Sequence, residues 1–174
     1  DQRTMGIPVY GSNGIYTYSD SALVQQHAVI IGRKGSVGKV HLSAEKCWIS
    51  DTAFYVIKDS LDESYFVYYL LSSLGLENMN TDAAVPGLNR DNAHRLEIKI
   101  PNSIEKRINL VEPLIKLDQK IHLNNQINQT LESIAQAIFK SWFVDFDPVR
   151  AKIAAKQEGK DPELAAMCAI SGKN

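Results

Sequence analysis

The residues best suited to chemistry lie in a glycine-rich segment from Ile31 to Val40, IGRKGSVGKV. A nucleotide-phosphate loop would need a glycine where Arg33 stands and a serine or threonine where Val40 stands. A tight turn between two strands explains the glycines, which adopt positive φ easily. It does not explain the basic side chains crowded into fourteen residues, with Glu45 as the only acid: Arg33, Lys34, Lys39, His41 and Lys46.

A loop that exposes backbone amides and several cations suits the phosphates of a nucleic acid. We therefore expect these five basic residues to contact DNA. The loop from Thr81 to Arg90 is a second candidate surface, because Asn89 and Arg90 carry side chains suited to adenine and guanine edges. Two alternatives stay open: the charges form an ordinary solvated face, and Asn89 serves a turn.

Catalytic and metal sites are not predicted. The four histidines, His27, His41, His94 and His122, show no ligand spacing and no adjacent base and nucleophile. Asp51-Thr52 has no evident partner, and no glycine-rich cofactor loop or Asn-Pro-Pro-aromatic motif of methyl transfer is present. The cysteines, Cys47 and Cys168, lie far apart, which fits a reducing cytoplasm. These features predict a cytoplasmic binding module with no metal or cofactor of its own.

Composition sets few limits on function. The chain has 174 residues and a formal net charge of −1, so no global positive field indicates nucleic acid. No apolar run approaches a membrane span, and no signal peptide is evident. DNA binding must therefore depend on local charge.

The basic segment must be positioned by a β-rich domain, expected over residues 1–101. Short β-branched and aromatic runs separated by turns predict the strands, and Ser64–Ser73 predicts one helix. Leu96–Ile100 alternates apolar and charged residues and predicts a last strand. The expected strands before it lie at 7–18, broken by the turn Gly11–Gly14, and at 28–32, 39–42, 47–49 and 53–57.

A long helix is expected over residues 102–147, kinked or broken near Pro113. Apolar residues at alternating steps of four and three form the seam of a coiled coil, and asparagines within such a seam fix its register. The helix therefore predicts a partner helix; the alternative is an internal helix pair of one compact domain. The seam consists of Leu110, Leu114, Leu117, Ile121, Asn124, Asn128, Leu131, Ala135, Ile138 and Trp142.

Aromatic residues gather at the end of this helix. Phe139, Phe143 and Phe146 lie to one side of the seam, beside Trp142, and form a broad face. We expect this face to dock a partner protein; the alternative is packing on a β-rich domain of this chain or of its partner. Residues 148–174 are expected to form a linker or tail with short helices near 151–156 and 162–170.

Three segments together resemble the DNA specificity (S) subunit of type I restriction-modification systems over roughly residues 7–150. One segment is LNRDNAHRLEIKIPNSIEKRINLVEPLIKLDQKIHLNNQINQTLESIAQAIFKSWFVDFDPV, whose part from NNQINQ onward is the most specific. Another is IIGRKGSVGKVHLSAEKCWISDTAFYVI, in which GRKGSVGKV and SDTAFYV are the next most specific. The third is IPVYGSNGIYTY. The resemblance implies an α+β fold: a β-rich target recognition domain followed by a long helix that pairs as an antiparallel coiled coil.

The resemblance also implies a role in an assembly. The chain would read one half of a bipartite target in double-stranded DNA, while the paired helices set the half-site spacing. It would hold methyltransferase (M) subunits, which bind S-adenosylmethionine, and join a restriction (R) subunit that uses ATP and Mg. The S subunit itself catalyses nothing. The aromatic face is then expected to dock the methyltransferase.

The chain departs from the usual S subunit, which has two recognition domains and two helices, because it has one of each. It also enters the recognition domain after the first strand or so. We therefore expect a fragment, or a half-length subunit that self-associates through the helix. The alternative function is a cytoplasmic coiled-coil scaffold that assembles other proteins and does not read DNA.

Overall fold

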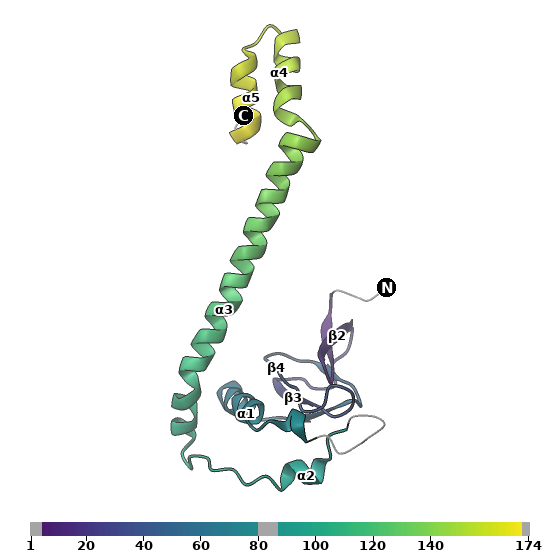
Figure 1. Cartoon of the computed structure of the whole chain (residues 1–174), viewed down its shortest axis with the longest axis vertical. Helices are drawn as coiled ribbons and strands as arrows, with labels where there is room; N and C mark the ends of the chain where they lie inside the picture. Colours follow the sequence, from purple (N-terminus) through teal and green to yellow (C-terminus); the bar gives the residue numbers. More distant parts are fainter. Residues whose placement is uncertain (1–4, 80–86, 172–174) are drawn as a thin grey trace. The chain divides into compact units, whose positions relative to one another are not determined.

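The computed structural model describes residues 5–79 and 87–171 (Figure 1). The chain divides into two compact units, Asp1–Lys116 and Leu117–Asn174, which are described separately. The residues 1–3, the greater part of the candidate loop at 81–90 and the last three residues of the expected tail lie outside the described residues.

The first unit contains two three-stranded sheets. In one, β1 (Ile7–Gly11) lies between β2 (Gly14–Ser19), which is antiparallel to it, and β5 (Trp48–Ile49), which is parallel. In the other, β3 (Ala28–Gly32) lies between β4 (Val40–Ser43) and β6 (Ala53–Val56), and both pairings are antiparallel. This architecture confirms the β-rich region expected from the sequence.

Strand β3 supplies the centre of the core, since all five of its residues are buried. Successive side chains of a strand point to opposite faces, so β3 serves two apolar clusters. Ala28 and Ile30 pack with Tyr10 and Cys47, among others, whereas Ile31 packs with Leu76 and its neighbours. Burial of a side chain such as Ile30 contributes about 2 kcal/mol, which explains why this apolar run becomes a central strand.

Helical segments follow the second sheet along the chain, and the first of them packs against β3 and β4. Helix α1 (Leu61–Ser73) begins where the Ser60 hydroxyl accepts a hydrogen bond from the Glu63 amide at 3.2 Å. A left-handed Gly75 leads into a 3₁₀ turn, η1 (Leu76–Asn78). After the undescribed residues comes a short helix, α2 (Arg90–His94), which the sequence did not predict.

The strand predicted over Leu96–Ile100 is wrong. This segment is irregular, and its apolar residues Leu96, Ile98 and Ile100 are 36%, 43% and 37% exposed. A strand requires a neighbouring strand to accept its backbone hydrogen bonds, and no strand within the described part of the chain pairs with it. Alternation of side chains alone therefore did not create a strand here.

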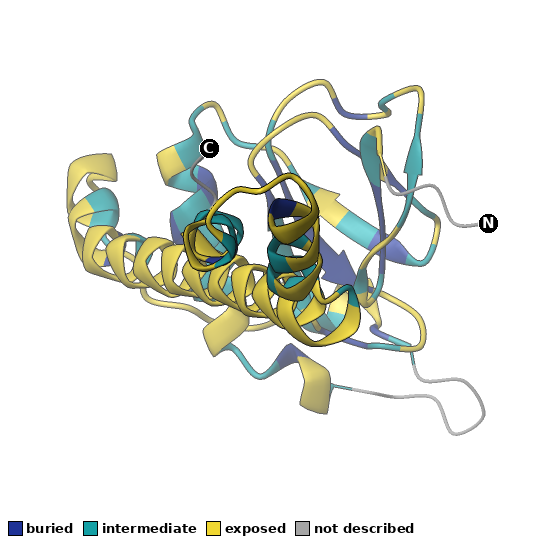
Figure 2. Cartoon of the chain, turned by 90° about the horizontal axis from the view of Figure 1, so that it is seen from above, coloured by how far each residue is buried: buried dark blue, intermediate teal, exposed yellow. Residues whose placement is uncertain are grey.

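The long helix is α3 (Ile104–Phe139), whose 36 residues extend about 54 Å. It runs unbroken through Pro113. An N-terminal contact orients its first turns, since the Arg107 guanidinium lies 5.9 Å from the centre of the Phe66 ring of α1. Val111 is its only buried residue, and most of its surface is exposed (Figure 2).

The chain leaves α3 through a π-helical turn, η2 (Lys140–Val144). Phe146 then adopts a left-handed conformation, with φ 54°, and α4 (Asp147–Gln157) begins. Regular α-helix thus ends at Phe139, ahead of the expected end near residue 147.

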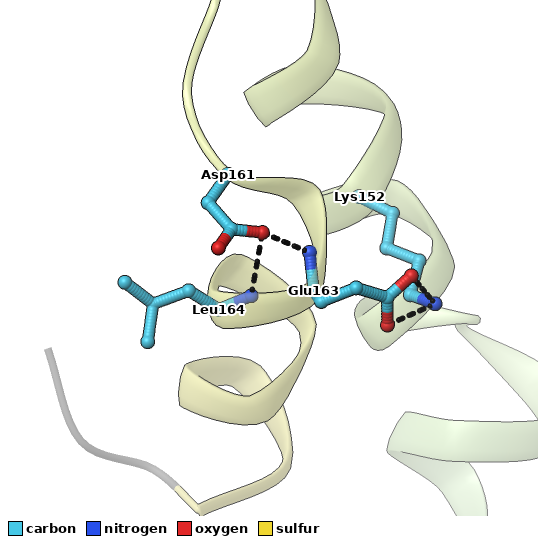
Figure 3. A network of polar contacts seen from close by, with 4 residues as sticks. All are labelled: Lys152, Asp161, Glu163 and Leu164. Carbon is cyan, nitrogen blue, oxygen red and sulfur yellow. Dashed lines mark hydrogen bonds and ion pairs between the residues drawn. The ribbon is translucent and has the colours of Figure 1, made fainter.

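Helix α5 (Pro162–Ser171) packs against α4 through small buried residues, Ala155 and Ala166. Lys152 of α4 forms a 2.7 Å ion pair with Glu163 of α5 (Figure 3). The Asp161 carboxylate caps α5 by accepting hydrogen bonds from the amides of Glu163 and Leu164, at 2.9 and 3.3 Å. Helices α4 and α5 overlap in sequence with the short helices expected near 151–156 and 162–170. The domain boundaries expected after residues 101 and 147 stay predictions.

Candidate nucleic-acid interface

The β3–β4 loop carries Arg33, Lys34 and Lys39 at one end of the second sheet, all three exposed. Its base is closed by two backbone hydrogen bonds of 2.8 Å, from the Gly32 amide to the Lys39 carbonyl and from the Gly38 amide to the Gly32 carbonyl. A Cβ on Gly38, which has φ 71°, would lie 2.2 Å from the Leu76 carbonyl carbon. Glycine is therefore required at the base of the loop.

Arg33 is held from three directions. The Thr52 carbonyl accepts hydrogen bonds from the amides of Arg33 and Lys34, at 2.9 and 3.1 Å. The Arg33 guanidinium lies 5.2 Å from the centre of the Phe54 ring, as a cation–π contact. The Arg33 carbonyl accepts from the Leu88 amide at 2.8 Å. The loop is thus fixed in place before any ligand binds.

The same contacts bring the second candidate surface beside the first. A β-bridge joins Lys34 to Gly87, so Asn89 and Arg90 follow directly and are both exposed. The Asn89 side chain caps α2 by accepting from the amides of Asp91 and Asn92, at 2.8 and 3.2 Å. Its carbonyl oxygen is therefore committed to the turn, the alternative left open by the sequence, while its amide group keeps its own donors.

His41 lies beside this edge but is half-buried. Burial lowers its pKa below the ordinary 6.5; a hydrogen bond to the Ser12 backbone raises it in part, and the charge of Lys39 lowers it further. The ring lies 6.5 Å from that of Tyr10, between centroids. His41 is consequently a neutral group near pH 7, and its Nε2 atom is buried, so the ring offers no charge at this edge.

Lys46 is not brought to the same edge. The β3–β4 ladder runs from Ile31 opposite Val40 to Ala28 opposite Ser43, and Lys46 follows the Ser43 end. Since strands rise about 3.3 Å per residue, at least about 10 Å of strand separates it from Lys39. Closeness in sequence had suggested one cluster, but the hairpin places these residues at opposite ends.

A hollow of about 320 Å³ lies between the β1–β2 turn and the β5–β6 turn. Asn13 stands at the tip of the first turn, where its side-chain oxygen accepts a 2.7 Å hydrogen bond from the Lys39 ammonium. Asp51 and Thr52 line the opposite side. Sequence reasoning identified the Gly11–Gly14 turn but gave it no role, because only the fold shows that it lies beside the basic loop.

The seam expected along α3 faces solvent. Leu117, Ile121 and Leu131 are 59%, 57% and 58% exposed. The aromatic residues that follow are equally open: Phe139, Phe143 and Phe146 are 60%, 59% and 52% exposed, and the rings of Phe139 and Phe143 lie 5.2 Å apart. Asn124 and Asn128 are exposed as well.

Neither a metal-ligand cluster nor a membrane-spanning helix occurs in the described ranges. Among residues 5–79 and 87–171, no group of three His, Cys, Asp or Glu side chains is placed to hold a metal ion. None of the helices in these ranges is both long and apolar enough to cross a bilayer.

A β-rich unit with a rigid basic edge, followed by a long exposed helix, defines an α+β recognition module. Residues 3–133 match the model of the type I restriction modification DNA specificity domain. The chain therefore belongs to this family, which confirms the resemblance. A specificity domain is also in keeping with the expected absence of catalytic function.

Two curated relatives cover only part of the chain. The chain is 54% identical over 91 residues to the HindI specificity subunit of Haemophilus influenzae, covering 51% of the chain and 20% of that protein. It is 29% identical over 105 residues to the MjaIX specificity subunit of Methanocaldococcus jannaschii, covering 58% of the chain and 24% of that protein. The match thus spans a quarter or less of these relatives.

A solved structure has the same fold. The S subunit of a type I restriction-modification system from M. genitalium superposes with a TM-score of 0.68 at 16% identity, covering 89% of this chain and 44% of that one. At this identity the likeness concerns the fold alone, and it confirms the β-rich domain followed by a long helix.

Proposed function

We propose that this chain reads one half of a bipartite double-stranded DNA target as the specificity component of a type I restriction-modification assembly. The observation that carries the proposal is the joining of two separate segments, Arg33–Lys34 and Asn89–Arg90, at one rigid edge of the β-rich unit. Membership of a DNA specificity family supports it.

The DNA phosphates are contacted by Lys34, Lys39 and Arg90, which are exposed on this edge. The Lys39 ammonium gives one of its three donors to Asn13 and keeps two for a phosphate. Arg33 is fixed over Phe54 and Asn89 is fixed by its cap, so both suit a base edge, where a defined direction matters. Lys46 lies outside this surface, and His41 supports the turn beneath it.

Helix α3 holds the subunits of the assembly together. A second copy, paired antiparallel along the Leu110–Trp142 seam, would cover the exposed leucines and set the spacing of two half-sites. The methyltransferase subunit, which carries S-adenosylmethionine, docks on Phe139, Phe143 and Phe146. A restriction subunit that uses ATP and Mg completes the assembly. The chain itself catalyses nothing and works in the cytoplasm.

A salt titration of DNA binding tests the proposal. The full chain with its methyltransferase partner should shift a DNA duplex, and log K should fall linearly with log salt. Lys39→Ala should weaken binding to every sequence and reduce the slope by about one. Lys99→Ala, which removes an exposed charge from the irregular segment before α3, is the matched control.

The outcomes separate two classes of function. Equal binding by wild type and by a variant lacking Arg33, Lys34 and Lys39 would remove this edge from the interface. Absence of any DNA binding, with the methyltransferase still held, would instead favour the coiled-coil scaffold. Loss of methyltransferase co-purification by Phe143→Ala, without loss of folding, tests the docking face separately.

A further inference from the structure

The Ser12-Asn13 turn between β1 and β2 is held by contacts with β3, β4 and the loop between them. The Lys39 ammonium donates to the Asn13 side-chain oxygen at 2.7 Å. His41 bonds to the Ser12 backbone, and its ring fills the space beside Gly14, where a Cβ would lie 3.3 Å from the ring. A Cβ on Gly32 would lie 2.7 Å from the Ser12 carbonyl oxygen, so the two loops are in backbone contact.

This arrangement gives the Asn13 side chain one orientation. Because its oxygen accepts from Lys39, the amide nitrogen is directed away and presents two N–H donors from an exposed position. Donors of this kind match the acceptors in the major groove: N7 and O6 of guanine, N7 of adenine and O4 of thymine. A side chain held in this way discriminates between bases, since a free one could turn its oxygen outward instead.

The surroundings of Asn13 favour a base edge over a phosphate. Asp51 lines the same hollow, and its carboxylate repels phosphate. Ile15 and Tyr16, which are 48% and 52% exposed, also line the hollow and offer apolar surface suited to a thymine methyl group or a base edge. The basic edge beside it remains available to the backbone.

We infer that Asn13 is a base-reading residue, with Lys39 as the positioning residue that orients its amide. The inference rests on the proposed function and adds to it a specificity determinant outside the basic segment. It concerns one hydrogen-bonding position in the half-site. Lys39 then has two separable effects, one on affinity through charge and one on specificity through Asn13.

Selection from a randomised duplex pool tests the inference. The full chain with its methyltransferase partner is allowed to select sequences, and discrimination is measured at each base pair. Asn13→Ala should lose about 10-fold or more of the discrimination at one base pair and leave the other positions unchanged. Lys39→Met should lose discrimination at that same base pair and also lower affinity for all sequences. The double variant should show no further loss of discrimination there.

Two controls and a second variant keep the test decisive. Asn102→Ala and Lys99→Met change exposed residues outside the hollow and should retain the wild-type preference. Asn13→Asp keeps the shape and the bond to Lys39 but replaces donors with an acceptor, so the preferred base should change to one presenting a donor. Thermal unfolding confirms that each variant is folded.

The failures of the two proposals are distinguishable. If wild type selects no sequence, the proposed function is wrong. If wild type selects a sequence and folded Asn13→Ala and Asn13→Asp select the same one with equal discrimination, the inference is wrong. Equal loss at every position would also overturn it, because the turn would then serve structure alone.

Discussion

Two glycines of the β3–β4 loop share a backbone conformation but differ in their surroundings. Gly35 and Gly38 have φ of 80° and 71°, so any other residue would be strained at either position. A Cβ on Gly35 would meet only the Ser12 hydroxyl, at 3.8 Å, whereas one on Gly38 would overlap the Leu76–Glu77 backbone. Substitution of Gly35 therefore adds conformational strain alone, whereas substitution of Gly38 adds both strain and steric overlap.

Gly35→Ala should lower the free energy of unfolding by about 1 kcal/mol, the strain of a left-handed residue. Gly38→Ala should lower it by clearly more, about 3 kcal/mol or above, because the backbone of η1 must also move. Chemical denaturation measures both. Equal losses would mean that the loop does not pack on η1 in solution.

His41 should give the protein an acid-sensitive contribution to stability. Its folded pKa lies below the unfolded value of 6.5, mainly because of burial, so folding favours the neutral ring. The contribution is present above pH 6.5 and is lost as the pH falls below it, since the unfolded state then binds a proton more readily. His41→Phe should flatten the decline in unfolding free energy between pH 7 and 5.

The measurement is denaturant unfolding at several pH values. His122→Gln, at an exposed position of α3, serves as the comparison. A decline that is as steep in His41→Phe as in wild type would show that another group carries the acid sensitivity.

At the scale of elements, the junction from α3 to α4 combines a π-helical turn with a strained residue. Phe146 has φ 54°, a left-handed conformation, and the residue is 52% exposed. The turn is held by hydrogen bonds from the Ser141 hydroxyl to Asp147 at 2.7 Å and from the Asp145 amide to the Lys140 carbonyl at 2.8 Å, and by the Lys140–Asp145 ion pair. Strain at an exposed aromatic residue is consistent with a functional contact.

Comparing Phe146→Gly with Phe146→Ala separates the backbone from the ring. The free energy of unfolding should be about 1 kcal/mol higher for Phe146→Gly than for Phe146→Ala, because glycine accepts the left-handed conformation. Both variants lack the ring, so both should lose methyltransferase co-purification. Full retention of the methyltransferase by either variant would remove Phe146 from the docking face.

The elements predicted from the sequence were those with a strong local pattern. The apolar run of β3 and the heptads of α3 specify their structures alone, and both are present. Leu96–Ile100 has the alternation of a strand, but no strand among the described residues pairs with it. Helix α2 depends on the Asn89 cap. In the candidate site, the charges of Arg33 to Lys39 were predictable, whereas the separation of Lys46 and the position of Asn13 depend on strand pairing.

At the scale of the whole molecule, large apolar side chains are exposed along most of the length of α3, and exposed apolar surface of this kind often marks an interaction site. Along α3 the exposed residues recur at seam spacing, and only Val111 is buried on this helix. Its length alone would permit many roles, but the regular exposure of leucine and isoleucine indicates a missing partner surface. Self-association through the seam would supply it.

Leu117→Asp or Leu131→Asp should therefore shift the chain to a monomer, because pairing would bury a charge. Gln126→Asp, at an exposed position outside the seam, introduces the same charge and should leave the assembly unchanged. Sedimentation equilibrium at micromolar concentration measures the mass. A monomeric wild-type chain would contradict the pairing.

The closed base of the β3–β4 loop has an evolutionary consequence. Gly32 and Gly38 tolerate no side chain, while the side chains of Arg33 and Lys34 between them are exposed. If this loop contacts DNA as proposed, substitutions of Arg33 and Lys34 would alter the chemistry offered to DNA with little loss of stability, so they would need no compensating change elsewhere. A chain built in this way can acquire a new preference by single mutations while its fold, its helix and its assembly stay the same.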